Sequence, residues 1–184
     1  MKHILTLTLG AALTFGLTAC SSTSSEAQTS SFSKRATNKK ITTAPDVNAI
    51  IALQSQRNYG AAVERADEAL ARPGLMEREI ITLTEFKANN LLMSGRAVES
   101  RRLWEDYTSI PSLLVHQEAK AYRQIGTLYY KEGNYKASAA AYEKLVAVAT
   151  DPMAGPVKPV DYNRLISALE RSGQSAAAAK YRGR

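Results

Sequence analysis

The chain has 184 residues, of which 45% are hydrophobic and 22% are charged, and its formal net charge is +7. These values are typical of one globular or repeat domain with a tail, and they exclude a fibrous or wholly low-complexity chain. From Asp46 onward, 19 basic and 16 acidic side chains leave a net charge of only +3. Because no basic stripe with interleaved aromatic residues appears, we expect no nucleic-acid partner.

Residues 1–19 have the features of a bacterial signal peptide. Lys2 precedes an uncharged run from Ile4 to Leu17. As a helix this run would be about 21 Å long, whereas the hydrocarbon core of a bilayer is about 30 Å thick. A cleaved export signal therefore fits better than a membrane-spanning helix.

The run ends in Leu17-Thr18-Ala19-Cys20, which resembles the lipobox of bacterial lipoproteins. The resemblance implies cleavage before Cys20, a covalent diacylglycerol and an N-acyl chain on that residue, and no other cofactor. Cys20 is the only cysteine, so it cannot form an internal disulfide. The alternative is a leftover thiol beside an ordinary cleavage site. By resemblance to enterobacterial lipoproteins, Ser21 in place of aspartate favours a lipid anchor in the outer membrane, facing the periplasm.

Residues 20–45 are expected to form a lipidated, disordered linker. The segment is dense in serine and threonine, carries four basic residues between Lys34 and Lys40, and has few apolar side chains. Such a composition cannot bury enough surface to offset the entropy lost on ordering. The basic group either contacts anionic lipid or cell-wall polymer or is simply solvated.

Residues 46–184 contain a repeated pattern of helix, break and helix. Gly95, Gly133 and Gly173 lie 38 and 40 residues apart, and Arg57 occupies the matching place 38 residues before Gly95. Glycine readily adopts the left-handed conformation that ends a helix and turns the chain. The spacing therefore predicts four breaks, each between a first and a second helix.

Other positions recur in the same register. An apolar side chain precedes each break, a small one follows it, bulky ones fill the next packing position in two units, and a proline ends the second helix. The apolar residues before the breaks are Leu53, Leu91, Tyr129 and Leu169, and the small residues after them are Ala62, Ser100, Ser138 and Ala178. The bulky residues are Trp104 and Tyr142, with Ala66 in the first unit, and the prolines are Pro73, Pro111 and Pro152. Their spacings of three and four place them on one helical face. Small residues also occur at Ala88 and Gly126, where a close approach of two helices would need them.

The pattern resembles the tetratricopeptide repeat (TPR) family over Asp46 to about Tyr181, most closely in the unit from Ala121 to Pro152. The resemblance implies an all-α fold, a solenoid of about four antiparallel helix hairpins after the disordered tether. The period exceeds the family's usual length of about 34 residues. Arg57 also stands where glycine is usual, and these departures leave the superhelical curvature open.

The residue types needed for catalysis or metal binding are scarce. His116 is the only histidine after the signal peptide, so a histidine–cysteine zinc site is excluded and a serine–histidine–aspartate triad would require His116 as its base. Carboxylates are spread along helices beside basic residues, and no glycine-rich phosphate loop is present. We therefore expect a protein that is not an enzyme.

The resemblance implies a groove lined by the first helix of each hairpin. Its positions, carried over by register, are Val47, Ile51 and Gln54; Glu85, Asn89 and Leu92; Lys120, Arg123, Thr127, Tyr130 and Lys131; and Asn163, Ser167, Glu170 and Arg171. The third set is basic, with Asn89 beside it. We predict that Asn89, the third set, Asn163 and Arg171 bind a protein partner through an acidic segment or C-terminal tail, with Tyr130 as an apolar contact. The alternative is that these are ordinary solvated residues.

The sequence thus predicts a lipid-anchored adaptor or scaffold in an envelope complex. The pattern is similar to that of TPR proteins in TonB-type energy transduction, pilus or secretion systems and outer-membrane assembly. Two other functions remain open. An envelope enzyme, such as a cell-wall hydrolase, would need a catalytic carboxylate in a deep cleft, and a periplasmic small-molecule carrier would need a closed apolar cavity.

Overall fold

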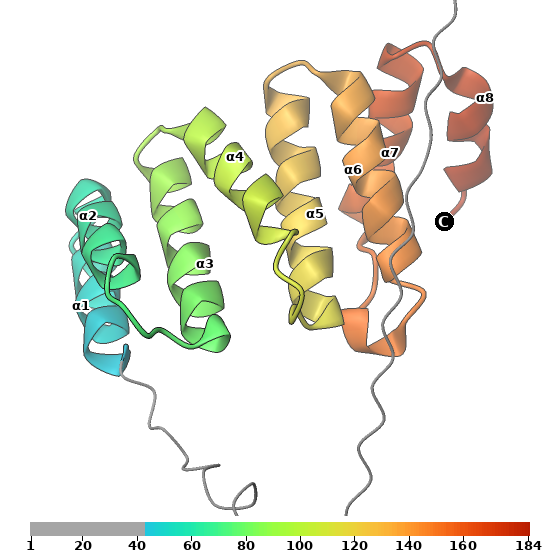
Figure 1. Ribbon diagram of the computed structural model, residues 1–184. Coiled ribbons are helices and arrows are strands. Elements are labelled where there is room, and N and C mark those ends of the chain that lie inside the picture. The colour runs from blue at the N-terminus through green and yellow to red at the C-terminus, as the bar shows by residue number, and fades with distance from the viewer. Residues whose placement is uncertain (1–42) are drawn as a thin grey trace, which may run out of the picture. The chain divides into compact units, whose positions relative to one another are not determined.

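The computed structural model describes residues 43–184, and this part of the chain is all-helical, as predicted (Figure 1). Its elements are α1 (Ala44–Ser55), α2 (Tyr59–Leu70), α3 (Glu77–Met93), α4 (Ala97–Tyr107), α5 (Val115–Lys131), α6 (Tyr135–Val148), α7 (Pro159–Arg171) and α8 (Ser175–Ala178), with short 3-10 turns η1 (Pro152–Ala154) and η2 (Ala179–Tyr181). The expected signal peptide, the lipidation site Cys20 and linker residues 20–42 lie outside the described residues.

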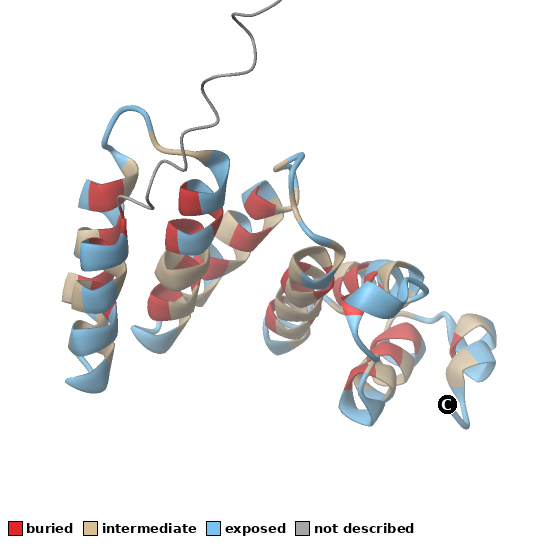
Figure 2. Cartoon of the chain, turned by 90° about the horizontal axis from the view of Figure 1, so that it is seen from below, coloured by how far each residue is buried: buried red, intermediate tan, exposed pale blue. Residues whose placement is uncertain are grey.

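The helices run alternately up and down, and each packs mainly on the helix before it and the helix after it (Figure 1). Among helices two steps apart, α1 touches α3 and α5 touches α7. Figure 2 shows the buried residues on the sides of the helices that face their neighbours. Trp104, Tyr107 and Tyr142 are the largest of the fully buried side chains. The core is therefore a series of helix–helix contacts along the chain.

All four predicted breaks have the same hydrogen-bonded geometry. The residue after each break donates its N–H to a carbonyl five positions earlier, in the pairs Asn58–Leu53, Arg96–Leu91, Asn134–Tyr129 and Gln174–Leu169. This is the Schellman arrangement, which needs a left-handed residue just before the donor. Gly95, Gly133 and Gly173 have φ of 84°, 76° and 79°, and Arg57 has φ of 59°. The equivalence of Arg57 with the three glycines is confirmed.

We expect Arg57→Gly to raise the free energy of unfolding by about 1 kcal/mol, because a side chain in the left-handed region costs about 1–2 kcal/mol and glycine returns part of this as chain entropy. Thermal unfolding followed by circular dichroism should show a midpoint about 4 °C higher. Gly133→Ala is the matched control and should lower stability by a similar amount. If the two changes moved the midpoint in the same direction, the strain at residue 57 would be disproved.

The small residues after the breaks join the two helices of a pair. The hydroxyls of Ser100 and Ser138 are buried, and they donate to the carbonyls of Ala88 and Gly126, at 2.8 Å in both cases. A larger side chain at either position would fill the space through which this bond passes. The same contact thus recurs in two successive pairs.

Gly126 lies directly against the ring of Tyr142. A Cβ atom at residue 126 would stand 2.9 Å from two carbon atoms of that ring. The ring is fixed by complete burial and by a 2.9 Å hydrogen bond between its hydroxyl and Thr127 Oγ1. The sequence predicts a small residue at position 126 for a close approach of two helices. The contact with α6 is the reason that this residue must be small.

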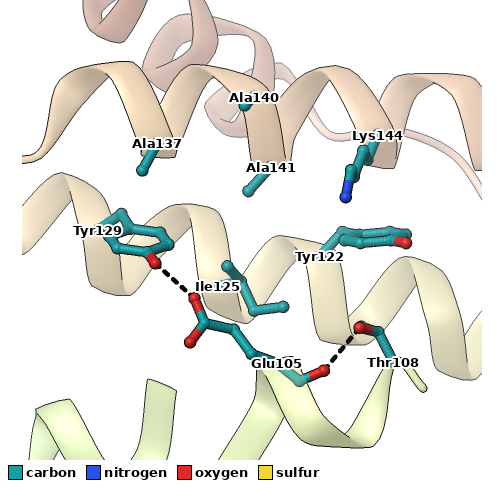
Figure 3. Close-up of a pocket in the computed structure, with 9 residues that line it drawn as sticks. All are labelled: Glu105, Thr108, Tyr122, Ile125, Tyr129, Ala137, Ala140, Ala141 and Lys144. Atoms are coloured by element: carbon teal, nitrogen blue, oxygen red, sulfur yellow. Dashed lines mark hydrogen bonds between the residues drawn. The ribbon is translucent and has the colours of Figure 1, made fainter. Parts of the chain in front are cut away.

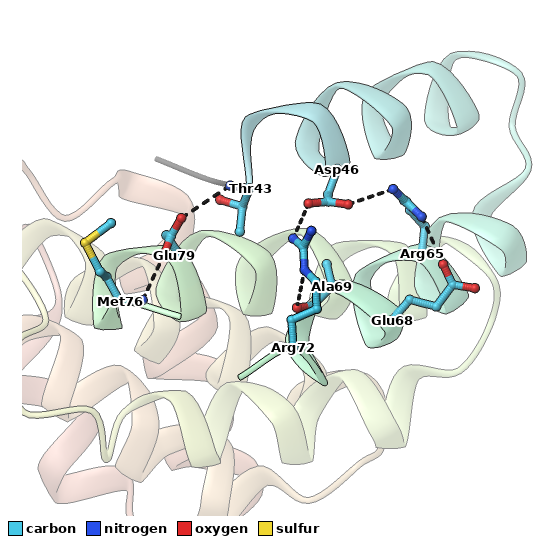
Figure 4. Close-up of polar contacts among 8 residues, drawn as sticks. All are labelled: Thr43, Asp46, Arg65, Glu68, Ala69, Arg72, Met76 and Glu79. Carbon is cyan, nitrogen blue, oxygen red and sulfur yellow. Dashed lines mark hydrogen bonds and ion pairs between the residues drawn. The ribbon is translucent and has the colours of Figure 1, made fainter. Parts of the chain in front are cut away.

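The first helix begins at Ala44, two residues before the domain boundary expected at Asp46. The backbone N–H of Thr43 donates to Glu79 Oε1 at 3.3 Å, and Asp46 accepts hydrogen bonds from Arg65, at 2.7 Å, and from Arg72 (Figure 4). Asp46 is only 2% exposed. These contacts with α2 and α3 order residues that the composition of the linker alone placed outside the domain.

Candidate partner-binding surface

The predicted groove residues are spread over three helices of the described chain. Asn89 is half-buried on α3, and Lys120, Arg123, Thr127 and Tyr130 are half-buried on α5, whereas Lys131 at the end of α5 and Asn163 and Arg171 on α7 are exposed. Arg123, Thr127 and Tyr130 meet α7 along one side of α5. Asn89 and Asn163 do not hydrogen-bond to that set.

Arg123 is held by a carboxylate of α7. Its Nε donates to Asp161 Oδ2 at 2.8 Å, and the same oxygen accepts the backbone N–H of Lys158 at 3.1 Å. Asp161 is 1% exposed, so Arg123 compensates a buried negative charge. The guanidinium predicted to grip an acidic partner therefore already has an internal acidic partner.

Asp161 is a buried charged residue that was not predicted from the sequence. The 38-residue spacing from Arg123 does not mark it, because the breaks of these two units lie 40 residues apart and place Asn163 at the matching position. One unit earlier, the corresponding contact between first helices is a 2.5 Å ion pair from Lys120 on α5 to Glu85 on α3. Charged pairs therefore join α3 to α5 and α5 to α7.

Two polar side chains of α5 are also bonded to α7. Thr127 Oγ1 accepts from Arg164 Nη1 at 3.1 Å, and the hydroxyls of Tyr130 and Ser167 lie 2.8 Å apart. Together with the Arg123–Asp161 pair, these bonds place three consecutive turns of α5 against α7. Thr127 and Tyr130 are thus parts of the α5–α7 contact as well as of its outer surface.

The α5 and α7 cations Lys131, Arg164 and Arg171 have no carboxylate within ion-pair distance among residues 43–184. The guanidinium of Arg171 lies 4.6 Å from the ring centre of Tyr135 and donates to its hydroxyl, and that ring meets Tyr130 edge-on. We call Lys131, Arg164, Arg171 and Tyr130 the basic face. It offers positive charge next to an aromatic side chain.

A hollow of about 320 Å³ lies between α4 and α6, with α5 as its floor (Figure 3). We call it the α4–α6 groove. Its lining residues are Tyr122, Ile125 and Tyr129 of α5, Ala137, Ala140, Ala141 and Lys144 of α6, and Glu105 and Thr108 of α4. The sequence does not predict this groove, because small residues on a helix give no signal of what faces them.

Hydrogen bonds to carboxylates and burial raise the pKa of several tyrosines. The hydroxyl of Tyr129 donates to Glu105 Oε1 at 2.5 Å, and this bond is the main reason that its pKa is raised. Burial raises the pKa of Tyr107, helped by its 2.5 Å hydrogen bond to Glu85. These phenols stay protonated, and therefore act as hydrogen-bond donors, at any physiological pH.

We expect Tyr107→Phe to flatten the loss of stability at alkaline pH. The folded-state pKa of Tyr107 is raised, so its contribution is complete below the unfolded-state pKa of about 10 and is lost as the pH rises above that value, by up to about 1.4 kcal/mol per pH unit. Urea unfolding between about pH 8.5 and pH 11 measures the slope. Equal slopes in the variant and the unaltered chain would contradict this assignment.

Candidate metal ligands are dispersed in the part of the chain that the structure describes. Among residues 43–184, no three histidine, cysteine or acidic side chains are grouped so that they could hold a metal ion, and His116 is exposed. In the same part of the chain, no helix has the length and hydrophobicity needed to span a bilayer. No protein-family model matches the chain, and no curated protein matches it. The interpretation of the surface therefore depends on the residues themselves.

Proposed function

We propose that this chain is a lipid-anchored adaptor of the TPR type, held at the periplasmic face of the bacterial outer membrane, that binds protein partners in an envelope complex. The observation that carries the proposal is the recurring helix-pair contact: the same break geometry at four places, and the same serine-to-carbonyl bond in two pairs. Helices stacked in this way bury one side and leave the rest of each helix open to a partner.

The basic face supports an acidic ligand. Lys131 and Arg171 are exposed and lie at the ends of α5 and α7, and Arg164 of α7 donates to Thr127 of α5. An acidic segment or a C-terminal carboxylate would gain charge-assisted hydrogen bonds there, and Tyr130 would supply apolar contact. Arg123 takes a structural role in this proposal, because Asp161 already neutralises it.

The lipobox residues Leu17–Cys20 support the anchor and the compartment. Several acyl chains at Cys20 would add about 0.8 kcal/mol of membrane affinity for each buried CH₂ group, which is enough for stable attachment. The proposed complex belongs to the class that includes TonB-type transduction, pilus or secretion machinery and outer-membrane assembly.

The anchor is tested by replacing Cys20 with alanine in the full chain, made in a Gram-negative host fed an alkyne analogue of palmitate. We expect the unaltered chain to carry the label and sediment with outer membranes, and Cys20→Ala to lose the label. Ser22→Ala, two residues away, is the control and should keep it. Equal labelling of Cys20→Ala would refute lipidation at this residue.

Partner binding is tested by chemical cross-linking in intact cells, purification in detergent and mass spectrometry. The double variant Lys131→Glu, Arg171→Glu should reduce recovery of the main cross-linked protein by about ten-fold or more. Arg102→Glu, an exposed cation on α4, is the matched control and should not. Unchanged recovery with the double variant would disprove the basic face as the binding site, and the absence of any specific cross-linked protein would count against the adaptor itself.

A further inference from the structure

The α4–α6 groove has a counterpart one unit earlier. A second hollow, of about 300 Å³, lies between α2 and α4 over α3. Seven of its eight lining residues stand 38 positions before a residue that lines the α4–α6 groove. The two hollows are therefore the same place in successive units, and comparing them separates what the fold requires from what is particular to one unit.

The earlier hollow is charged. Lys87 on its floor forms a 2.5 Å ion pair with Asp67 of α2, and Arg102 of α4 projects from its edge. The matching positions in the α4–α6 groove are Ile125 and Ala140. The earlier unit folds with a lysine and an arginine at these positions. Packing alone therefore does not explain why the α4–α6 groove has isoleucine and alanine there.

Each hollow has a charged side chain outside every ion pair of residues 43–184, and at one matched position the sign of that charge differs. Lys144 has no carboxylate within ion-pair distance among the described residues, and its ammonium lies 5.4 Å from the ring centre of Tyr122 (Figure 3). The matching residue of the earlier unit is Asp106, of opposite sign. The one carboxylate that lines the groove, Glu105, is engaged by Tyr129 and by Arg101.

We propose that the α4–α6 groove is a second protein-binding site, which receives one large apolar side chain of an acidic partner segment. The side chain would lie over Ile125, between Tyr122 and the alanines of α6, and a carboxylate one helical turn away would pair with Lys144. The volume, about 320 Å³, lies at the lower end of the range for ligand pockets and suits a single aromatic side chain. This site is separate from the basic face and depends on the proposed function only in that its ligand is a polypeptide.

The probe is a fluorescent, alanine-based helical peptide of about 14 residues that carries one phenylalanine and one glutamate four positions apart. Fluorescence anisotropy with the full chain in detergent should show saturable binding. Ala140→Arg, which copies the residue of the preceding unit, should weaken binding by about ten-fold or more, whereas Arg102→Ala in the earlier hollow should leave it unchanged. An unaltered melting curve for Ala140→Arg shows that the loss is local.

The proposed ion pair between Lys144 and a carboxylate of the partner is tested by exchanging the two charges. Lys144→Asp should weaken binding of the glutamate peptide, and a peptide with lysine in place of glutamate should recover it. No saturable binding of the probe, or equal binding to Ala140→Arg, would overturn the proposal. Loss of peptide binding in the double variant Lys131→Glu, Arg171→Glu, with retention in Ala140→Arg, would assign the peptide to the basic face; this result would reject the groove and leave the adaptor function intact.

Discussion

Gly126→Ala is expected to lower the free energy of unfolding by about 2 kcal/mol, although alanine is the better helix former by about 1 kcal/mol. The added Cβ would stand 2.9 Å from the Tyr142 ring, which is fully buried and hydrogen-bonded to Thr127. A shift of α5 would disturb the bond from Ser138 to the Gly126 carbonyl, and a shift of the ring would disturb its bond to Thr127. Urea unfolding at neutral pH measures the loss.

Gly60 provides the matched control for this change. It is the second residue of α2, and a Cβ there would meet nothing within 4 Å, so Gly60→Ala should leave stability unchanged or raise it by up to about 0.5 kcal/mol. In the background Tyr142→Leu, which removes the ring, Gly126→Ala should cost nothing further. Additive losses in that double variant would show that the contact between Gly126 and Tyr142 is not the cause.

Arg123→Met is expected to lower the free energy of unfolding by about 3 kcal/mol, because it leaves the Asp161 carboxylate buried without its compensating charge. Methionine keeps the length of the side chain, so the loss reports charge more than packing. The Asp161 carboxylate would retain only the N–H of Lys158 on the oxygen that Arg123 now contacts. The damage should be greatest at the α5–α7 contact.

Hydrogen exchange followed by mass spectrometry should therefore show faster exchange in α7 and α8 than in α2 and α3 of the variant. Arg123→Met combined with Asp161→Asn should be more stable than Arg123→Met alone, since the uncompensated charge is then removed. Lys131→Met, which alters an exposed cation on the same helix, is the control and should change stability by less than about 0.5 kcal/mol. A uniform loss of protection along the chain would contradict the local role of the pair.

Helix α5 is shared by both proposed binding surfaces. Tyr122, Ile125 and Tyr129 line the groove between α4 and α6, and Thr127 and Tyr130 lie on the side that meets α7. A helix with 3.6 residues per turn presents these two sets on different faces. Substitutions inside α5 would therefore affect both surfaces, and the variants that separate the two binding sites lie on α4, α6 and α7 or at the exposed end of α5.

Much of the fold followed from local preferences that a sequence expresses directly. Three features were sufficient to place the helix pairs: glycine at three breaks, a small residue after each of them, and a proline after three second helices. The structure has helices on both sides of every predicted break. Helix α1 begins at Ala44, two residues before Asp46, and Thr43 and Asp46 contact side chains of α2 and α3 that are far away in the sequence.

The sequence by itself determined where the chain turns, because the left-handed conformation at residues 57, 95, 133 and 173 depends on the residue and its immediate neighbours. Only the tertiary structure decided what the charged and small side chains do. Arg123 was identified as a surface cation, but Asp161 becomes its partner only when α7 packs on α5. The alanines of α6 border a groove only because α4 and α6 stand apart over α5. The physical reason is that burial and charge compensation are properties of pairs of elements, whereas the conformation of a turn belongs to a few consecutive residues.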